Sequence, residues 1–131
     1  MLRSYLGIML GGALGSVLRY AVSQYCAYRW GETFPVGTLI INITGSFLIG
    51  IFAGLSDTES RIVMGPHLRQ FLMIGICGGY TTFSSFSLQT LNLARNGQWL
   101  YAGLNILLSV VLCLVGVWVG FALVQYMNRL R

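Results

Sequence analysis

The chain has little charge of either sign and no lysine at all. Only 8% of its 131 residues are charged, whereas 56% are hydrophobic. An ordinary soluble domain carries about 25% charged residues, so these few charges would leave a water-facing surface very thinly covered. The scarcity of charge argues against a soluble enzyme and indicates a chain that lies largely in a membrane.

Acidic residues are especially scarce. Glu32, Asp57 and Glu59 are the whole set, and each falls between apolar stretches rather than within one. A proton- or cation-coupled exporter usually needs a carboxylate at membrane depth. Its absence there argues against an energy-coupled exporter.

Residues that could carry catalysis or bind a metal are also few. Cys26, Cys77 and Cys113 are far apart and show no metal-ligand or CxxC spacing. The single histidine, His67, lies near the end of an apolar stretch, where a structural role is the ordinary one. No nucleophile, base and orienting acid can be assembled at one depth, so we expect that the protein is not an enzyme.

The formal net charge of +5 could suggest a nucleic-acid partner. The arginines, however, are scattered along the chain, at positions 3, 19, 29, 61, 69, 95, 129 and 131. A nucleic-acid site gathers basic residues into a patch. We therefore interpret most of them as charges that flank membrane spans.

Hydropathy and helix-breaking residues divide the chain into four apolar stretches long enough to cross a bilayer. They run from about Ser4 to Tyr28, Phe34 to Leu55, His67 to Leu93 and Trp99 to Met127. We expect an all-α membrane protein in which residues 1–131 form a single four-helix transmembrane domain.

An even number of spans places both chain ends on one side of the membrane. That side carries Arg3, Arg61, Arg129 and Arg131, and the other carries Arg29 and Arg95. The positive-inside rule gives a slight bias toward internal termini. With so few charges, insertion in both orientations is an equally open interpretation.

Glycines recur at helical spacing in every span. They are Gly7, Gly11, Gly15, Gly50, Gly54, Gly75, Gly79, Gly116 and Gly120. Small residues four apart let helix backbones approach closely in lipid. Because four spans enclose little interior, we expect some of these faces to meet another copy of the chain.

Polar residues form a stripe on two of the spans. The stripes are Thr38, Asn42 and Ser46 on the second span, and Asn105, Ser109 and Cys113 on the fourth. Polar groups inside a membrane need a partner, water or a permeating ligand. Either they hydrogen-bond between helices, or they line a hydrated or ion-binding track.

The third span carries the densest polar segment, GGYTTFSSFS at residues 78–87. Adjacent glycines followed by two β-branched threonines are poor helix formers, which predicts a broken third helix near mid-membrane. Carbonyls freed by such a break can bind a cation. A glycine hinge that serves close packing alone is the alternative.

Two phenylalanines of this segment, Phe83 and Phe86, are three apart and project to similar sides. Facing lipid or core is the ordinary role of such rings. An aromatic ring also has a positive edge, and hydroxyls surround both residues. Ring edges and hydroxyls together suit a small dehydrated anion that must be released again.

Arg19 lies inside the first span. Placing an arginine at the centre of a membrane helix costs about 2.5 to 3.5 kcal/mol on insertion scales. Either its side chain reaches the interface, or it offers positive potential to an anion in a water-filled vestibule.

Three segments together resemble one known family. GALGSVLRY lies in the first span, GTLIINITGSFLIG in the second and GICGGYTTFSSFS in the third. They are similar to the Fluc (CrcB-type) fluoride channels of microorganisms, and the resemblance covers all four spans in order and length. It implies an antiparallel, dual-topology homodimer with two fluoride pores, in the bacterial cell (inner) membrane as a multi-pass protein.

The resemblance also implies roles for single residues. Asn42 corresponds to the pore-lining asparagine, Phe83 and Phe86 to the aromatic residues whose ring edges line the fluoride path, and Ser109 to a hydroxyl on the fourth-span polar track.

Further roles follow from the same resemblance. Thr38 and Asn105 are candidate members of the fluoride pathway, and Arg19 corresponds to the arginine near the vestibule. The backbone carbonyls of Gly78 and Thr81 correspond to those that hold a structural sodium ion at the dimer interface.

The function that the resemblance implies is a fluoride-selective ion channel that passively exports fluoride from the cytoplasm and confers fluoride resistance. One rival is a small four-helix multidrug exporter, which would need a membrane carboxylate. Another is a non-transporting membrane anchor subunit, which would leave the polar stripes without a purpose.

Overall fold

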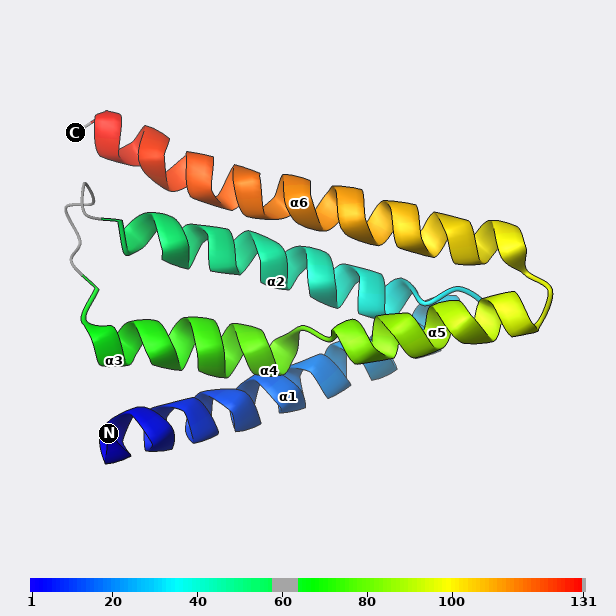
Figure 1. Cartoon of the computed structure of the whole chain (residues 1–131), viewed down its shortest axis with the longest axis horizontal. Helices are drawn as coiled ribbons and strands as arrows, with labels where there is room; N and C mark the ends of the chain where they lie inside the picture. Colours follow the sequence, from blue (N-terminus) through cyan, green and yellow to red (C-terminus); the bar gives the residue numbers. More distant parts are fainter. Residues whose placement is uncertain (58–63, 131) are drawn as a thin grey trace.

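The computed structural model describes residues 1–57 and 64–130. The described chain is helical and contains no strand. Its elements are α1 (Leu2–Trp30), α2 (Val36–Leu55), α3 (Pro66–Arg69), η1 (Gln70–Cys77), α4 (Gly78–Tyr80), α5 (Phe83–Arg95) and α6 (Trp99–Arg129). The elements α3 to α5 follow one another along a single span, in which η1 is a π-helix (Figure 1).

Within the described residues, four helical segments are long and apolar enough to cross a membrane. They are Leu2–Trp30, Val36–Leu55, Pro66–Arg95 and Trp99–Arg129. Their ends differ from the expected spans by at most about two residues, the ordinary uncertainty of a helix end. The all-α fold with four spans is therefore confirmed. Both chain ends lie at the same end of the molecule (Figure 1).

Glycine and proline set the boundaries of the spans. Gly31 ends α1 with φ of 76°, and Gly97 separates α5 from α6 with φ of 74°. Residues with a side chain rarely adopt this left-handed conformation. Pro35 stands just before α2, and Pro66 opens α3, where the missing amide hydrogen costs nothing.

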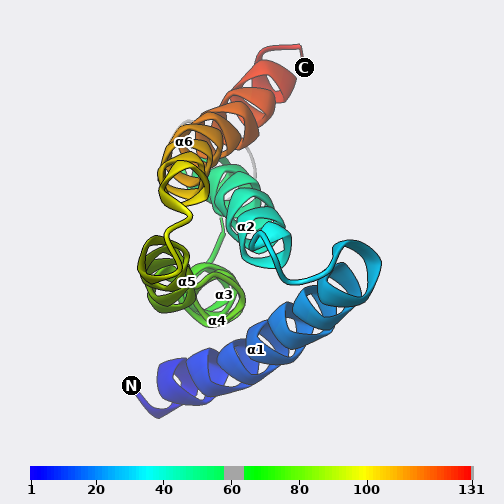
Figure 2. The same cartoon turned by 90° about the vertical axis from the view of Figure 1, so that its right-hand side faces the viewer.

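The first span crosses the third and the second crosses the fourth (Figures 1 and 2), and each pair meets through its glycine faces. A methyl group on Gly15 of α1 would collide with the backbone of Ile76 in η1. A methyl group on Gly75 of η1 would lie 3.0 Å from the Cα atom of Gly11 in α1. In the same way, a methyl group on Gly120 of α6 would collide with the backbone of α2. Close glycine packing is therefore confirmed.

The glycine faces find neighbours within the chain itself. All nine glycines of the expected faces find neighbours within 4 Å in their own chain, the first span against the third and the second against the fourth. The expectation that some of these faces also meet another copy stays a prediction, because the described residues belong to a single chain.

The outer surface of the bundle is apolar. In the most apolar part of each span, only 11% to 28% of the residues are buried. Exposed side chains include Leu14, Val17, Leu114 and Trp118. The tyrosines and tryptophans near the helix ends are exposed as well, which fits an interfacial aromatic belt.

Five of the six described arginines lie near the ends of the helices, and Arg19 lies inside α1. Arg3, Arg69 and Arg129 belong to helix ends near the chain termini, whereas Arg29 and Arg95 lie at the opposite ends. Arg69 lies in the first turn of the third span, on the same side as the chain termini. It adds to the excess of arginine on that side. Glu59, Arg61 and Arg131 lie outside the described residues.

Candidate functional site

The third span is interrupted between α4 and α5. Thr81 has φ of −79° and ψ of 159°, and Thr82 has φ of −152° and ψ of 112°, so both are extended. Gly78 keeps a helical conformation and Gly79 packs against Gly12 of α1. The β-branched threonines, rather than the glycines before them, leave the helix.

Asn42 of α2 pairs with the backbone at this interruption. The Thr82 amide donates to Asn42 Oδ1 at 2.8 Å, and Asn42 Nδ2 donates to the Thr82 carbonyl at 3.1 Å. In a continuous α-helix the Thr82 amide would donate to the carbonyl of Gly78. The side chain of Asn42 therefore replaces a helical hydrogen bond and frees that carbonyl.

Thr82 also starts the helix that follows. Its side-chain oxygen accepts a hydrogen bond from the backbone amide of Ser85 at 3.2 Å, which caps α5. Its hydroxyl lies 3.0 Å from the Ser85 hydroxyl and 3.3 Å from that of Ser84. The hydroxyl-rich sequence thus folds into a capped helix start whose polar groups surround the interruption.

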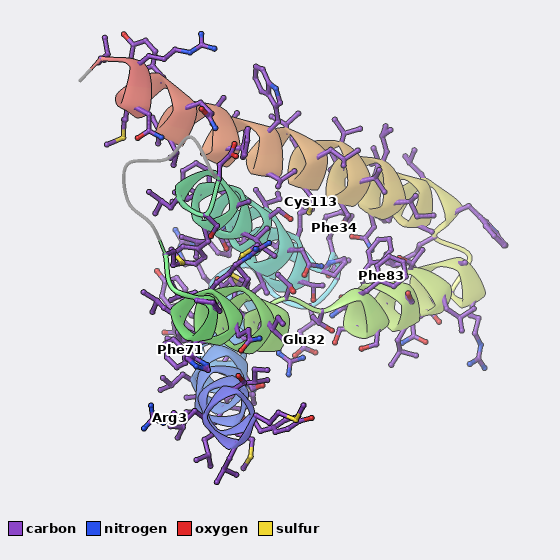
Figure 3. The ribbon with its side chains drawn as sticks, turned by 60° about the vertical axis from the view of Figure 1, so that its left-hand side comes forward. Arg3, Glu32, Phe34, Phe71, Phe83 and Cys113 are labelled. Carbon is purple, nitrogen blue, oxygen red and sulfur yellow. The ribbon has the colours of Figure 1, made fainter. Side chains whose placement is uncertain are left out.

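A cavity of about 450 Å³, here called the central cavity, lies beside the interruption. It brings together many of the expected site residues: Asn42, Ser46, Gly78, Thr81, Phe83, Phe86, Ser109 and Cys113. Phe83 from α5 and Cys113 from α6 can be located in Figure 3. The central cavity therefore combines an amide, hydroxyls and aromatic rings from the second, third and fourth spans.

The two phenylalanine rings of the central cavity lie next to each other. Their centroids are 5.3 Å apart and their planes are inclined by 51°. Phe86 is 8% exposed and Phe83 is 77% exposed in the single chain. Tilted rings present edges as well as faces, and ring edges are weakly positive.

A second cavity of about 260 Å³, the arginine cavity, lies on the other side of Thr82. Arg19, Ser85 and Gln89 contribute to its wall, and Thr38 lies here rather than in the central cavity. Thr82 lines both cavities. The polar stripe of α2 therefore passes from one cavity to the next.

A third cavity of about 500 Å³, the outer cavity, lies at the α1–α2 and α5–α6 connections. It shares Ser23, Thr38 and Gln89 with the arginine cavity. Glu32 lines this outer cavity and neither of the other two. The three cavities thus follow one another through shared walls, from a loop end of the molecule to the phenylalanines.

Gln89 is a polar wall residue that the sequence analysis did not single out. Its Oε1 atom is buried without a hydrogen-bond partner. A terminal amide offers two donors as well as its acceptor. Gln89 can therefore present either kind of group where the outer cavity meets the arginine cavity. Its spacing, three residues after Phe86 on the same helix, is the signal that could have revealed it.

Asn105, which we expected along the fluoride pathway, lines none of these three cavities. It is 1% exposed, and its Nδ2 atom donates to Thr90 Oγ1 of α5 at 2.8 Å. This amide joins two helices. His67 likewise makes a structural contact, with its Nδ1 atom 3.1 Å from Ser4 Oγ.

Comparison with known proteins identifies the family. Residues 6–121 match the family model described as CrcB-like protein, Camphor Resistance (CrcB). The chain is 56% identical to the fluoride-specific ion channel FluC of Opitutus terrae over 127 residues, which covers 97% of this chain and 96% of the relative.

Two further relatives agree. The FluC proteins of Methylocella silvestris and Rhodospirillum rubrum are 53% and 57% identical to this chain, over 97% and 89% of its length and over 97% and 91% of their own. Similarity of this extent spans all four helices and the segments that build the cavities. The chain therefore belongs to the CrcB-like family, together with relatives named as fluoride-specific ion channels.

Proposed function

We propose that this chain forms a fluoride-selective ion channel. The observation that carries the proposal is the central cavity, where Asn42, Ser109, Phe83 and Phe86 bring amide, hydroxyl and ring-edge groups together midway along the third span. The names of the relatives favour the same function. A small anion that loses water needs such donors in place of its hydration shell.

The cavities suggest a route for the ion. Fluoride enters the outer cavity, passes Arg19 and Thr38 in the arginine cavity, and reaches the phenylalanines beyond Thr82. Arg19 supplies positive potential along this route. Weak hydroxyl and ring-edge contacts bind the ion loosely enough for it to leave.

Transport by this route is passive. The acidic residues Glu32 and Asp57 lie outside the helices, and neither lines the central or the arginine cavity. A coupled exporter usually carries a titratable group at membrane depth. Because fluoride enters cells as neutral HF and dissociates inside, an open anion path is sufficient to export it and to confer fluoride resistance.

We also propose that two chains assemble as an antiparallel, dual-topology homodimer with two pores, in the bacterial inner membrane. The apolar surface around the exposed ring of Phe83 supports a partner there. Arginines at both helix ends are compatible with both orientations, although Arg69 favours internal termini. A C-terminal cysteine tag should react with an impermeant reagent from both sides of the membrane, and labelling from one side alone would contradict dual insertion.

The residues at the interruption also fit a structural sodium ion at the dimer interface. The carbonyl of Gly78 has lost the helical partner that the Thr82 amide would provide, and Thr81 follows in an extended conformation. Backbone carbonyls are suitable ligands for a hard cation. Gly78 and Thr81 of each copy would together hold the ion, which supplies positive charge and rigidity between the two chains.

Two other functions are separable by one experiment. Fluoride efflux from liposomes that contain the purified protein is measured with chloride as a control and without a proton gradient. The channel predicts fluoride efflux alone. A coupled multidrug exporter would show no efflux without a proton gradient, and a membrane anchor would show none under any gradient.

A further inference from the structure

Next to the central cavity, hydrogen bonds link α6 to α5 in a short chain. Asn105 Nδ2 donates to Thr90 Oγ1 at 2.8 Å, and Thr90 Oγ1 donates to the backbone carbonyl of Phe86 at 2.8 Å. Asn105 is 1% exposed and Phe86 is 8% exposed. A buried amide on one helix thus reaches the backbone of a buried aromatic residue on the other through a single hydroxyl.

The residue spacing along α5 and α6 shows where these bonds lie relative to the central cavity. Thr90 follows Phe86 by four residues, and Ser109 follows Asn105 by four residues. Residues four apart lie on the same helix face, one turn from each other. The bond between Asn105 and Thr90 therefore joins α6 to α5 one turn away from Ser109 and Phe86, which both line the central cavity.

We propose that Asn105 and Thr90 are positioning residues that set the separation between the Phe86 ring and the Ser109 hydroxyl, and thereby favour fluoride over larger anions. The proposal rests on the proposed function. Neither residue lines any of the three cavities described above. They act through the placement of α5 on α6, and not by contact with the ion.

The physical basis is the stiffness of a short buried link. The Asn105 amide reaches Thr90 when α5 and α6 keep their observed register. A shift of one helix along the other would leave this buried donor without a partner, which is costly in a nearly dry environment. A fixed register keeps the ring and the hydroxyl at a constant separation. Without the link, the ring can move, and the cavity can admit a chloride ion, which is larger than fluoride.

Helix attachment alone is the competing role for these bonds. It predicts lower stability when the bonds are removed, with unchanged discrimination between anions. Positioning predicts altered discrimination even in protein that remains folded. The ratio of fluoride to chloride permeability therefore separates the two roles.

Ser87 provides a matched control. Its hydroxyl donates to the carbonyl of Phe83 at 2.9 Å, the same bond to the preceding turn that Thr90 makes to Phe86. Ser87 is exposed and its hydroxyl bonds within α5, so Ser87→Ala removes a local bond without touching the link between the two helices. Thr90→Val removes the hydroxyl at constant shape, and Thr90→Ser retains it.

The experiment measures fluoride and chloride flux for these variants in liposomes. We expect Thr90→Val to lower the fluoride-to-chloride ratio about fivefold or more, comparable to the loss of one buried hydrogen bond, while Thr90→Ser and Ser87→Ala retain the wild-type ratio. Asn105→Leu should reproduce the effect, and the double variant should be no worse than either single one. An unchanged ratio in Thr90→Val and Asn105→Leu would overturn the proposal.

A second measurement tests the link independently of flux. With 4-fluorophenylalanine at position 86, Thr90→Val should shift or broaden the ¹⁹F resonance, and Thr90→Ser should not. A resonance that Thr90→Val leaves unmoved contradicts the positioning role. Wild-type protein that passes no fluoride would instead contradict the proposed function, whatever the resonance does.

Discussion

Asn42 and Thr82 form a reciprocal pair in which one side-chain amide satisfies both backbone groups of a residue outside the helix. The donor–acceptor distances are 2.8 Å to Asn42 Oδ1 and 3.1 Å from Asn42 Nδ2. Backbone that leaves a helix at membrane depth must find partners inside the protein. One asparagine on α2 thus makes the interruption of the third span possible.

Replacing Asn42 by alanine should reduce both stability and flux. Both backbone groups of Thr82 would lose their partner, and a buried unsatisfied group costs about 1 to 3 kcal/mol. Thermal unfolding in detergent and fluoride efflux from liposomes measure the two effects. The matched control is Gln24→Ala, an exposed amide on α1 that lines none of the three cavities. Wild-type Tm and flux in Asn42→Ala would contradict the role given to the pair.

Gly15→Ala should destabilise the bundle without a direct effect on the cavities. The new methyl group would collide with the Ile76 carbonyl and would lie 2.8 Å from the Tyr80 amide. Overpacking of this kind costs about 1 to 3 kcal/mol, which would lower Tm. Gly12→Ala, one turn away on α1, meets nothing within 4 Å and should leave Tm unchanged or higher, since alanine favours helix. Equal effects of the two variants would argue against tight packing at Gly15.

Phe83→Ile and Phe86→Ile should each reduce fluoride flux about tenfold or more, equivalent to about 1.4 kcal/mol of barrier. Isoleucine keeps an apolar side chain but lacks the positive ring edge. Size-exclusion chromatography should still show the wild-type assembly. Phe121→Ile on α6, away from the three cavities, is the control. Wild-type fluoride flux in both Phe83→Ile and Phe86→Ile would show that these two rings do not line the fluoride path.

Sodium removal should lower the Tm of the assembled protein. The proposed ligands are the backbone carbonyls of Gly78 and Thr81, which side-chain substitution cannot delete, so a titration is the sharper test. Replacing sodium by N-methylglucamine should lower Tm, and adding sodium back should restore it by mass action. A Tm that does not depend on sodium would count against the site.

Much of the fold follows from the sequence alone. Apolar stretches bounded by breakers such as Gly31, Pro35 and Gly97 predict four spans with ends correct to about two residues, because hydropathy and helix breakers act locally. The π-helix of η1 was not predicted. Hydropathy and glycine spacing predict that a helix is present but do not distinguish its hydrogen-bond pattern.

The site was predictable in part. The spacing of Asn42 and Ser46, and of Phe83 and Phe86, placed residues on common faces, and the structure brings them to one cavity. Asn105 satisfied the same spacing rule beside Ser109, yet its amide turns to Thr90. Spacing selects the face of a helix, whereas the partner on the neighbouring helix depends on how the two are rotated and shifted against each other.

Passive, selective conduction of fluoride is tested most directly by current through a planar bilayer containing the purified protein, with a fluoride gradient and equal pH on both sides. A fluoride-selective channel predicts a current whose reversal potential follows the fluoride gradient, by about 59 mV for each tenfold ratio. A chloride gradient should leave the reversal potential in place. No current, or a reversal potential set by chloride or by protons, would contradict the account.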